Sequence, residues 1–421
     1  MSRMHVGICG PVASKDLKDL MGLDPLALPK GYDGAPLMVT LVEGLLGLGH
    51  QVTVFTLSND LRLDGGTVRI RSRIHAALEV VFCPLRRHAW RRCEGRPGRI
   101  LDLYRHERAC LAETMRQVAP AVIHAHWTYE FAWAALDTAI PTVVTAHDSP
   151  LLVARMNTWA KPTVSLYRWL RVLMARRVLQ QARHVTVVSP YLAVALRRMT
   201  RKPPEVIPNP VDGRSLALGM DRHLGQDLRI ALVSHGFDRR KNPKPALLAF
   251  ALLKGVKPQA RLLLFGHGFE PDGEAAAWCR SRRELAACLS AMEFCGPVPH
   301  AQLLDRLAHC DLLLHSSLEE TFGMVLAESM ALGLPVVAGQ SSGAVPWVVA
   351  DPRCLCDIRD PHAIADAALR MLEPRTYAAL SSRLRRTVKE RFNADRVIRA
   401  YVRSYLAAMD GEPYRPRPEG G

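Results

Sequence analysis

Two glutamates eight positions apart, Glu320 and Glu328, are the residues of this chain best suited to chemistry. Between them, Gly323 marks the point where a short apolar strand (residues 310–315) has given way to a helix. The start of a helix presents free backbone N–H groups and the positive end of the helix dipole, which together favour a phosphate. The two carboxylates would lie roughly 12 Å apart at helical rise. This layout suits a ligand with a hydroxyl-rich group on each side of a diphosphate.

The full run from Ser316 to Val337 reads Ser-Ser-x-x-Glu-x-Phe-Gly-x-x-x-x-Glu-x-Met-Ala-x-Gly-x-Pro-Val-Val. It resembles the Glu-x7-Glu signature of the retaining nucleotide-sugar glycosyltransferases of family 4. The resemblance implies a GT-B fold, an α/β architecture of two Rossmann-like parallel-sheet domains facing each other across a cleft. It also implies roles for the quoted residues. Glu320 would hold the sugar, Glu328 would take the ribose hydroxyls, and backbone groups of Phe322, Gly323 and Met324 would lie near sugar and phosphate. A solvated acidic helix face would not explain the glycine.

Further donor-side residues follow from the same resemblance. Lys241, between a strand at residues 230–234 and a helix starting near Pro243, matches the family's phosphate-binding lysine. The arginine that usually precedes it is missing, because this chain has His235 and Gly236 there, so Arg240 or Arg239 is expected to supply the second cation. Gly266 resembles the first glycine of the family's Gly-x-Gly turn beneath the nucleotide. Val298 stands at the position whose backbone, in members of the family, contacts the base of the nucleotide.

Two residues of the first half complete the predicted site. His147 ends a strand in Thr145-Ala-His-Asp and resembles the histidine that contacts the donor sugar. Gly34, in a Gly-rich loop, would let the backbone approach the phosphates. His124 and His126 share one strand face, but no third metal ligand is evident. We expect no metal and no cofactor, since the chain lacks an Asp-x-Asp element and Lys241 with the helix terminus would replace a metal's charge.

The chain of 421 residues is long enough for two domains. Short apolar strands alternate with helices in both halves, which indicates βαβ units and parallel sheets. We predict an acceptor-side domain over residues 1–205 and a nucleotide-sugar domain over 206–393. A C-terminal helix, 394–410, would cross back to the first domain, and 411–421 would form a disordered tail. The linker resembles the family's Ile-Pro-Asn-Pro-Val-Asp, here starting at Ile207.

Composition indicates a cytoplasmic protein. The first strand, residues 6–9, is not a secretory signal, and no apolar run approaches the ~20 residues that span a bilayer. The ten scattered cysteines are expected to be reduced. The formal charge of +16 is uneven, with eleven arginines against four acids between Arg69 and Arg108. A second basic run, residues 159–183, interleaves aromatic residues. This pattern favours either a solvated basic face or peripheral docking on an anionic membrane. Nucleic acid is not an expected partner, because no reader motif is present.

The resulting prediction is a metal-independent retaining glycosyltransferase that acts by front-face attack, with a nucleoside-diphosphate sugar as donor. Its acceptor would be a glycan or a lipid-linked, anionic molecule of cell-surface polysaccharide or glycolipid assembly. Two alternatives stay open at this point: a GT-B-type nucleotide-sugar epimerase, and a degenerate, non-catalytic binding protein, which the missing arginine would fit. A Rossmann dehydrogenase is disfavoured because the segment between Gly7 and Gly10 lacks the Gly-x-Gly-x-x-Gly spacing.

Overall fold

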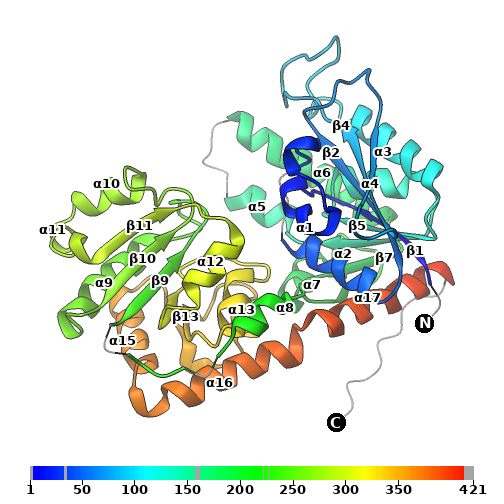
Figure 1. Cartoon of the computed structure of the whole chain (residues 1–421). Helices are drawn as coiled ribbons and strands as arrows, with labels where there is room; N and C mark the ends of the chain where they lie inside the picture. Colours follow the sequence, from blue (N-terminus) through cyan, green and yellow to red (C-terminus); the bar gives the residue numbers. More distant parts are fainter. Residues whose placement is uncertain (1–2, 33–35, 157–161, 221, 226, 412–421) are drawn as a thin grey trace. The chain divides into compact units, whose positions relative to one another are not determined.

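A computed structural model describes residues 3–32, 36–156, 162–220, 222–225 and 227–411. The chain forms two compact units, which are shown in Figure 1. Unit 1 comprises Met1–Pro210 and Ala394–Gly421, and unit 2 comprises Val211–Asn393. The division between the units therefore follows Pro210, whereas the sequence placed it after residue 205. The helix α17 (Ala394–Met409) belongs to unit 1.

Unit 1 is built on an eight-stranded sheet in the order β3-β4-β2-β1-β5-β6-β7-β8. All neighbouring strands are parallel except β3 and β4, which are antiparallel. The strands are β1 (His5–Cys9), β2 (Gln51–Ser58), β3 (Val68–Arg71), β4 (Leu78–Pro84), β5 (Val122–His126), β6 (Thr142–Ala146), β7 (His184–Val187) and β8 (Glu205–Val206). The central strands are buried along almost their whole length, as expected for a parallel sheet covered on both faces.

Helices cover both faces of this sheet. They are η1 (Ser14–Asp16), α1 (Lys18–Met21), η2 (Pro25–Ala27), α2 (Leu37–Gly47), α3 (Arg105–Val118), α4 (Glu130–Leu136), α5 (Pro150–Met156), α6 (Pro162–Gln181), α7 (Pro190–Leu196) and α17. The C-terminal α17 packs against α2 and contacts β5 and β6. A Cβ at Gly44 of α2 would come within 1.9 Å of Ile398 Cδ1 of α17, so this glycine permits the close packing of the two helices.

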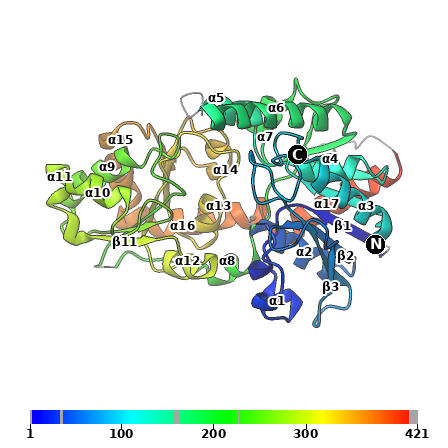
Figure 2. The same ribbon diagram turned by 90° about the horizontal axis from the view of Figure 1, so that it is seen from above.

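Unit 2 holds a six-stranded, all-parallel sheet in the order β11-β10-β9-β12-β13-β14. The strands are β9 (Arg229–Val233), β10 (Arg261–Phe265), β11 (Met292–Gly296), β12 (Leu312–Leu314), β13 (Val336–Gly339) and β14 (Leu355–Cys356). The helices are α8 (Gly213–Leu218), α9 (Pro243–Val256), α10 (Glu274–Arg280), α11 (Arg283–Ala286), η3 (Leu289–Ala291), α12 (His300–Leu307), α13 (Met324–Ala331), α14 (Val345–Val349), η4 (Pro352–Cys354), α15 (Pro361–Met371) and α16 (Pro374–Arg391). Helices α9 and α15 lie side by side on one face of the sheet, and α12 lies on the other (Figure 2). The strand order reverses between β9 and β12, and ligands of open parallel sheets bind at such a switch point.

Three pairings were not expected from the sequence. Strands β3 and β4 form a hairpin at the sheet edge, within the arginine-rich segment. The predicted linker contributes β8, which pairs with β7, and β14 extends the second sheet. Two-residue strands and alternating charged residues carry too little periodicity to be recognised from sequence.

Two arginines of the basic runs lie inside the protein. This finding corrects the prediction that both runs form an exposed basic face. Arg86 is fully buried and bonds the carboxylates of Glu107 at 2.6 Å and Asp102 at 2.8 Å. Arg171 of α6 pairs with Glu130 at 2.6 Å, and its guanidinium lies 3.5 Å from the ring centroid of Tyr129. These two arginines form internal ion pairs instead of adding to an exposed basic face.

All ten cysteines are free thiols, as predicted. Among the described residues, every helix is too short or too polar to cross a bilayer.

Candidate active site

The carboxyl ends of the unit 2 strands carry the residues singled out by the sequence. Because all six strands are parallel, the loops that follow them meet at one edge of the sheet. Lys241 follows β9, Gly266 follows β10, Val298 follows β11, and Glu320 follows β12. The structure thus brings the predicted donor residues of this unit to a common edge.

The closest contact at this edge joins the two loops at the switch point. The ammonium of Lys241 lies 2.7 Å from Oε1 of Glu320, and Nε2 of His315 lies 3.6 Å from the same oxygen. Both partners of the ion pair are largely buried, with side chains 14% and 15% exposed. Burial acts to raise the pKa of Glu320, but His315 and the charge of Lys241 outweigh it and hold that pKa well below its usual value. Glu320 is therefore a carboxylate near neutral pH and is not suited to donate a proton.

Backbone contacts hold the two loops together. Ser316 donates its hydroxyl to the carbonyl of Lys241 at 2.9 Å, and the Leu318 N–H donates to the carbonyl of Arg240 at 2.8 Å. On the other side, the Ala344 N–H donates to the carbonyl of Glu320 at 2.9 Å. These bonds leave the positions of the lysine and the carboxylate little freedom, which is what a preorganised charged site requires.

Helix α13 begins at this edge. Gly323 is its N-cap with φ of 90°, a left-handed conformation that favours glycine. Phe322 is buried and packs edge to face on Phe392 and Trp347, which anchors the turn. Met324 is the first residue of the helix, so its N–H is among those without an intrahelical partner. The turn therefore presents a dipolar anion site next to the Lys241–Glu320 pair.

The second carboxylate, Glu328, lies in the middle of α13 and is buried. One of its oxygens lies 2.9 Å from Nε2 of His300, the first residue of α12. The imidazole fixes one carboxylate oxygen, and a carboxylate has further lone pairs for a ligand's hydroxyl groups.

Gly266 is required by the backbone at its position. Its φ is 109°, and a Cβ there would lie 1.9 Å from the carbonyl oxygen of Ser234.

Burial lowers the pKa of His235, and the charges of His267, Lys241 and Arg240 lower that pKa further. Arg240 therefore lies within electrostatic range of this edge and is half-buried, whereas Arg239 is exposed.

In unit 1, His147 follows β6 and is 8% exposed. Its Nε2 lies 2.9 Å from Nδ1 of His126, and the Trp127 ring lies 4.4 Å from its own. Burial lowers the pKa of His147 to about 3, so the ring is neutral near pH 7 and serves as a hydrogen-bonding group. Gly34, predicted for the same side of the site, lies outside the described residues.

The neighbouring His124 is a packing residue with both ring nitrogens engaged. Its Nδ1 lies 2.7 Å from the Tyr405 hydroxyl, and its Nε2 lies 2.6 Å from that of Thr145. Within the described ranges, no three His, Cys, Asp or Glu side chains are grouped so that they could hold a metal ion.

Sequence reasoning missed His315 and His300. His315 was taken only as the end of a strand, and His300 comes from a helix 28 residues away from Glu328. The one available signal for His315 was its position directly before the Ser316 motif.

Comparison with known proteins shows the family to which the chain belongs. A model of group 1 glycosyl transferases matches residues 221–391, and a model of glycosyltransferase family 4 matches residues 36–214. The D-inositol 3-phosphate glycosyltransferase of Mycolicibacterium smegmatis is 30% identical over 315 residues, 70% of each chain. The chain belongs to the glycosyltransferases of group 1 and family 4. The predicted family is thereby confirmed.

Other relatives match over shorter stretches. A D-inositol 3-phosphate glycosyltransferase of Streptomyces avermitilis is 32% identical over 50% of this chain and 47% of its own length. The N-acetyl-alpha-D-glucosaminyl L-malate synthase of Bacillus anthracis is 33% identical over 24% of this chain and 28% of its own. The chain thus spans about half or less of the length of these two relatives.

Solved structures confirm the GT-B fold. A sucrose-phosphate synthase from Thermosynechococcus elongatus superposes with a TM-score of 0.73 at 21% identity, covering 97% of this chain and all of that one. Anabaena HepE in complex with UDP superposes with a TM-score of 0.62 at 16% identity, covering 96% of this chain and 100% of that one.

Proposed function

We propose that this glycosyltransferase transfers a sugar from a nucleoside diphosphate to an acceptor with retention of anomeric configuration and without a metal ion. The observation that carries the proposal is the largely buried Lys241–Glu320 ion pair beside the start of α13, at the switch point of the sheet. Support also comes from HepE, whose solved complex contains UDP.

The chemistry follows from the charges. Departure of the nucleoside diphosphate leaves extra negative charge on the β-phosphate, which needs cations or dipoles for stabilisation. The Lys241 ammonium has three N–H donors and gives one to Glu320, so the others can bond phosphate oxygens. The first N–H groups of α13 would add dipolar stabilisation. Glu320, held as a carboxylate, would orient the sugar, and the departing phosphate oxygen would take the acceptor's proton.

Substitution of the ion pair tests this proposal. Glu320→Gln and Lys241→Met should each lower turnover of a cognate donor by about 10²-fold or more, because each removes charge placed for the transition state. Glu390→Gln on α16, an exposed carboxylate of the same unit, is the matched control and should leave turnover unchanged. Turnover is measured by release of nucleoside diphosphate from a panel of donors and acceptors.

Two further readouts address stereochemistry and metal. The anomeric proton coupling of the product, measured by NMR, should match that of the donor. Turnover should persist after dialysis against chelator. Full activity in Glu320→Gln, an inverted product, or loss of activity that a divalent cation restores would each contradict the proposal.

The proposed acceptor is lipid-linked or anionic and is met at a membrane surface. Helix α6 exposes Leu166, Trp169 and Leu173, which are three and four positions apart and so share a helix face. Arg176 and Arg177 are exposed one turn further on. Apolar anchors followed by cations are typical of helices that bind anionic bilayers. Such an acceptor would fit the assembly of a cell-surface polysaccharide or glycolipid.

Vesicle flotation tests the membrane part. The protein should float with vesicles containing anionic lipid more than with neutral ones, and a Trp169→Ser, Leu173→Ser variant should lose most of this binding. Leu26→Ser, at a leucine that is 94% exposed elsewhere in unit 1, is the control. Equal binding to both vesicle types, or equal flotation of the variant, would refute it.

A further inference from the structure

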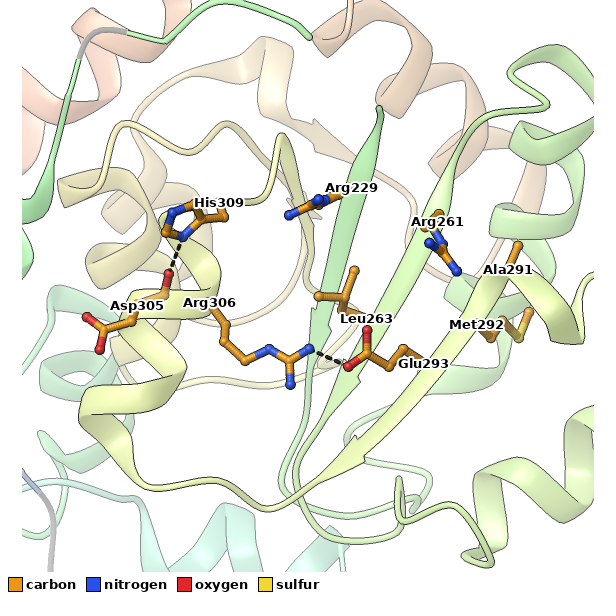
Figure 3. A pocket seen from close by; sticks show the side chains of 9 residues that line it. All are labelled: Arg229, Arg261, Leu263, Ala291, Met292, Glu293, Asp305, Arg306 and His309. Carbon is orange, nitrogen blue, oxygen red and sulfur yellow. Dashed lines mark hydrogen bonds and ion pairs between the residues drawn. The ribbon is translucent and has the colours of Figure 1, made fainter. Parts of the chain in front are cut away.

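A large cavity lies at the opposite edge of the unit 2 sheet from the candidate active site. Its volume is about 640 Å³, within the size range of small-molecule sites. Figure 3 shows its lining side chains, which come from the amino-terminal parts of three neighbouring strands and from the region of α12. The lining residues are Arg229, Arg261, Leu263, Ala291, Met292, Glu293, Asp305, Arg306 and His309. The Lys241–Glu320 pair lies at the carboxyl ends of the strands, so this cavity is a separate place.

The cavity exists because α12 is short. The sheet face formed by Arg261 and Leu263 of β10 and by Glu293 of β11 must be covered by the connection from β11 to β12. The helical part of that connection is only the eight residues of α12, and the cavity lies between this helix and the sheet face. The floor is apolar, consisting of Leu263, Ala291 and Met292, each 8% or 9% exposed.

Two arginines at the mouth are the unusual feature. Arg229 and Arg261 are register neighbours on adjacent parallel strands, so both side chains leave the same face of the sheet and line the same cavity. Like charges at neighbouring positions of a sheet are destabilising. Neither side chain makes an ion pair with any residue that the structure describes. An anion between them would relieve this repulsion.

The nearby carboxylates have other partners. Glu293 bonds Arg306, as drawn in Figure 3, and Asp305 lies 3.1 Å from Arg214. Asp311 accepts the backbone N–H of Arg229 at 2.7 Å. The second oxygen of Glu293 remains an acceptor for hydroxyl groups. Arg261 acts on Glu293, and Arg229 on Asp311, through longer-range electrostatic attraction. The lining thus combines two cations that make no ion pair among the described residues, one hydroxyl-accepting carboxylate and an apolar floor.

We infer that this cavity is a second ligand site of unit 2, which binds a phosphorylated sugar-like metabolite. Arg229 and Arg261 hold the phosphate, Glu293 accepts from hydroxyl groups, and Leu263 with Met292 contacts the apolar face of the ring. Helix α12 runs from this cavity to His300, the partner of Glu328. An occupant would therefore contact the same helix that supports the candidate active site.

Isothermal titration of the full chain with glucose 6-phosphate, inorganic phosphate and glucose tests the inference without any donor. Glucose 6-phosphate should bind with one-to-one stoichiometry and more tightly than either component alone. Arg229→Gln and Arg261→Gln should each weaken it about tenfold, the effect of losing a charge-assisted hydrogen bond. Both side chains are exposed, so folding should survive, which circular dichroism checks.

The matched control is the Arg375→Gln, Arg386→Gln variant, which removes two exposed arginines of α16 in the same unit. Glucose 6-phosphate should bind this variant as it binds the native chain. The inference is overturned by absence of binding at millimolar concentration, by equal weakening in the control variant, or by inorganic phosphate or glucose binding as tightly as the sugar phosphate. None of these outcomes depends on transferase activity, so they are independent of the proposed function.

Discussion

The buried histidine at the end of β6 provides a quantitative prediction. His147 has a folded-state pKa lowered by burial from 6.5 to about 3. The unfolded chain therefore binds this proton first as the pH falls, so stability is fully present above 6.5 and is lost progressively between 6.5 and 3. Between pH 7 and pH 5 this one group should lower the free energy of unfolding by about 2 kcal/mol. Burial also lowers the pKa values of His124 and His126, which act in the same direction.

The assay must report on unit 1 alone, because a chain of two units need not unfold in one step. Native-state hydrogen exchange of peptides covering β5 and β6 measures the free energy of opening in that unit. The fall in this free energy between pH 7 and pH 5 should be about 2 kcal/mol smaller in His147→Gln than in the native chain. His88→Gln, at an exposed histidine of the same unit, should behave like the native protein.

Equal loss of stability in His147→Gln and in the native chain between the two pH values would contradict this prediction. A direct check is the ring-carbon NMR signal of His147, which should show no titration between pH 8 and pH 5. Titration near 6.5 would mean that the ring is accessible to water and that its proposed role as a neutral hydrogen-bonding group is wrong.

Three further predictions concern single side chains. Gly266→Ala should lower the thermal stability of unit 2 by about 2 kcal/mol or more, because the residue has φ of 109° and no room for a Cβ. The control Gly255→Ala, in open space on α9, should be neutral or stabilising. Arg86→Met should lower the free energy of opening of unit 1, measured by hydrogen exchange, by about 3–5 kcal/mol, because two carboxylates lose their cation. The exposed Arg87→Met should cost little. Glu328→Gln should reduce by about tenfold the preference for a nucleoside diphosphate over its 2′,3′-dideoxy form, measured by titration. An unchanged preference would contradict the ribose role of this glutamate.

Much of the fold was predictable because its signals are local. The helix α17 has an apolar face at helical spacing, so its limits, predicted as 394–410 and observed as Ala394–Met409, were predicted within about one residue. The hairpin of β3 and β4 was missed, because its outer strand alternates half-buried and exposed residues at an edge where little burial is required. The burial of Arg86 was missed for a related reason. Its acidic partners lie 16 and 21 positions away, and no local pattern shows that they converge on it.

The same distinction applies to the candidate site. The sequence alone indicated the family and the helix start at Gly323, which the comparisons and the structure confirm, because residue types and spacing within one motif carry these signals. The roles of Lys241, Glu320 and Glu328 stay predictions. Only the tertiary structure shows that Lys241 and Glu320 form an ion pair and that His315 and His300 contact the two carboxylates. It also shows that Arg229 and Arg261 line one cavity. These facts depend on which strands are neighbours. Strand order is set by packing over the whole sheet, and the spacing of residues along the chain does not show which strands are neighbours.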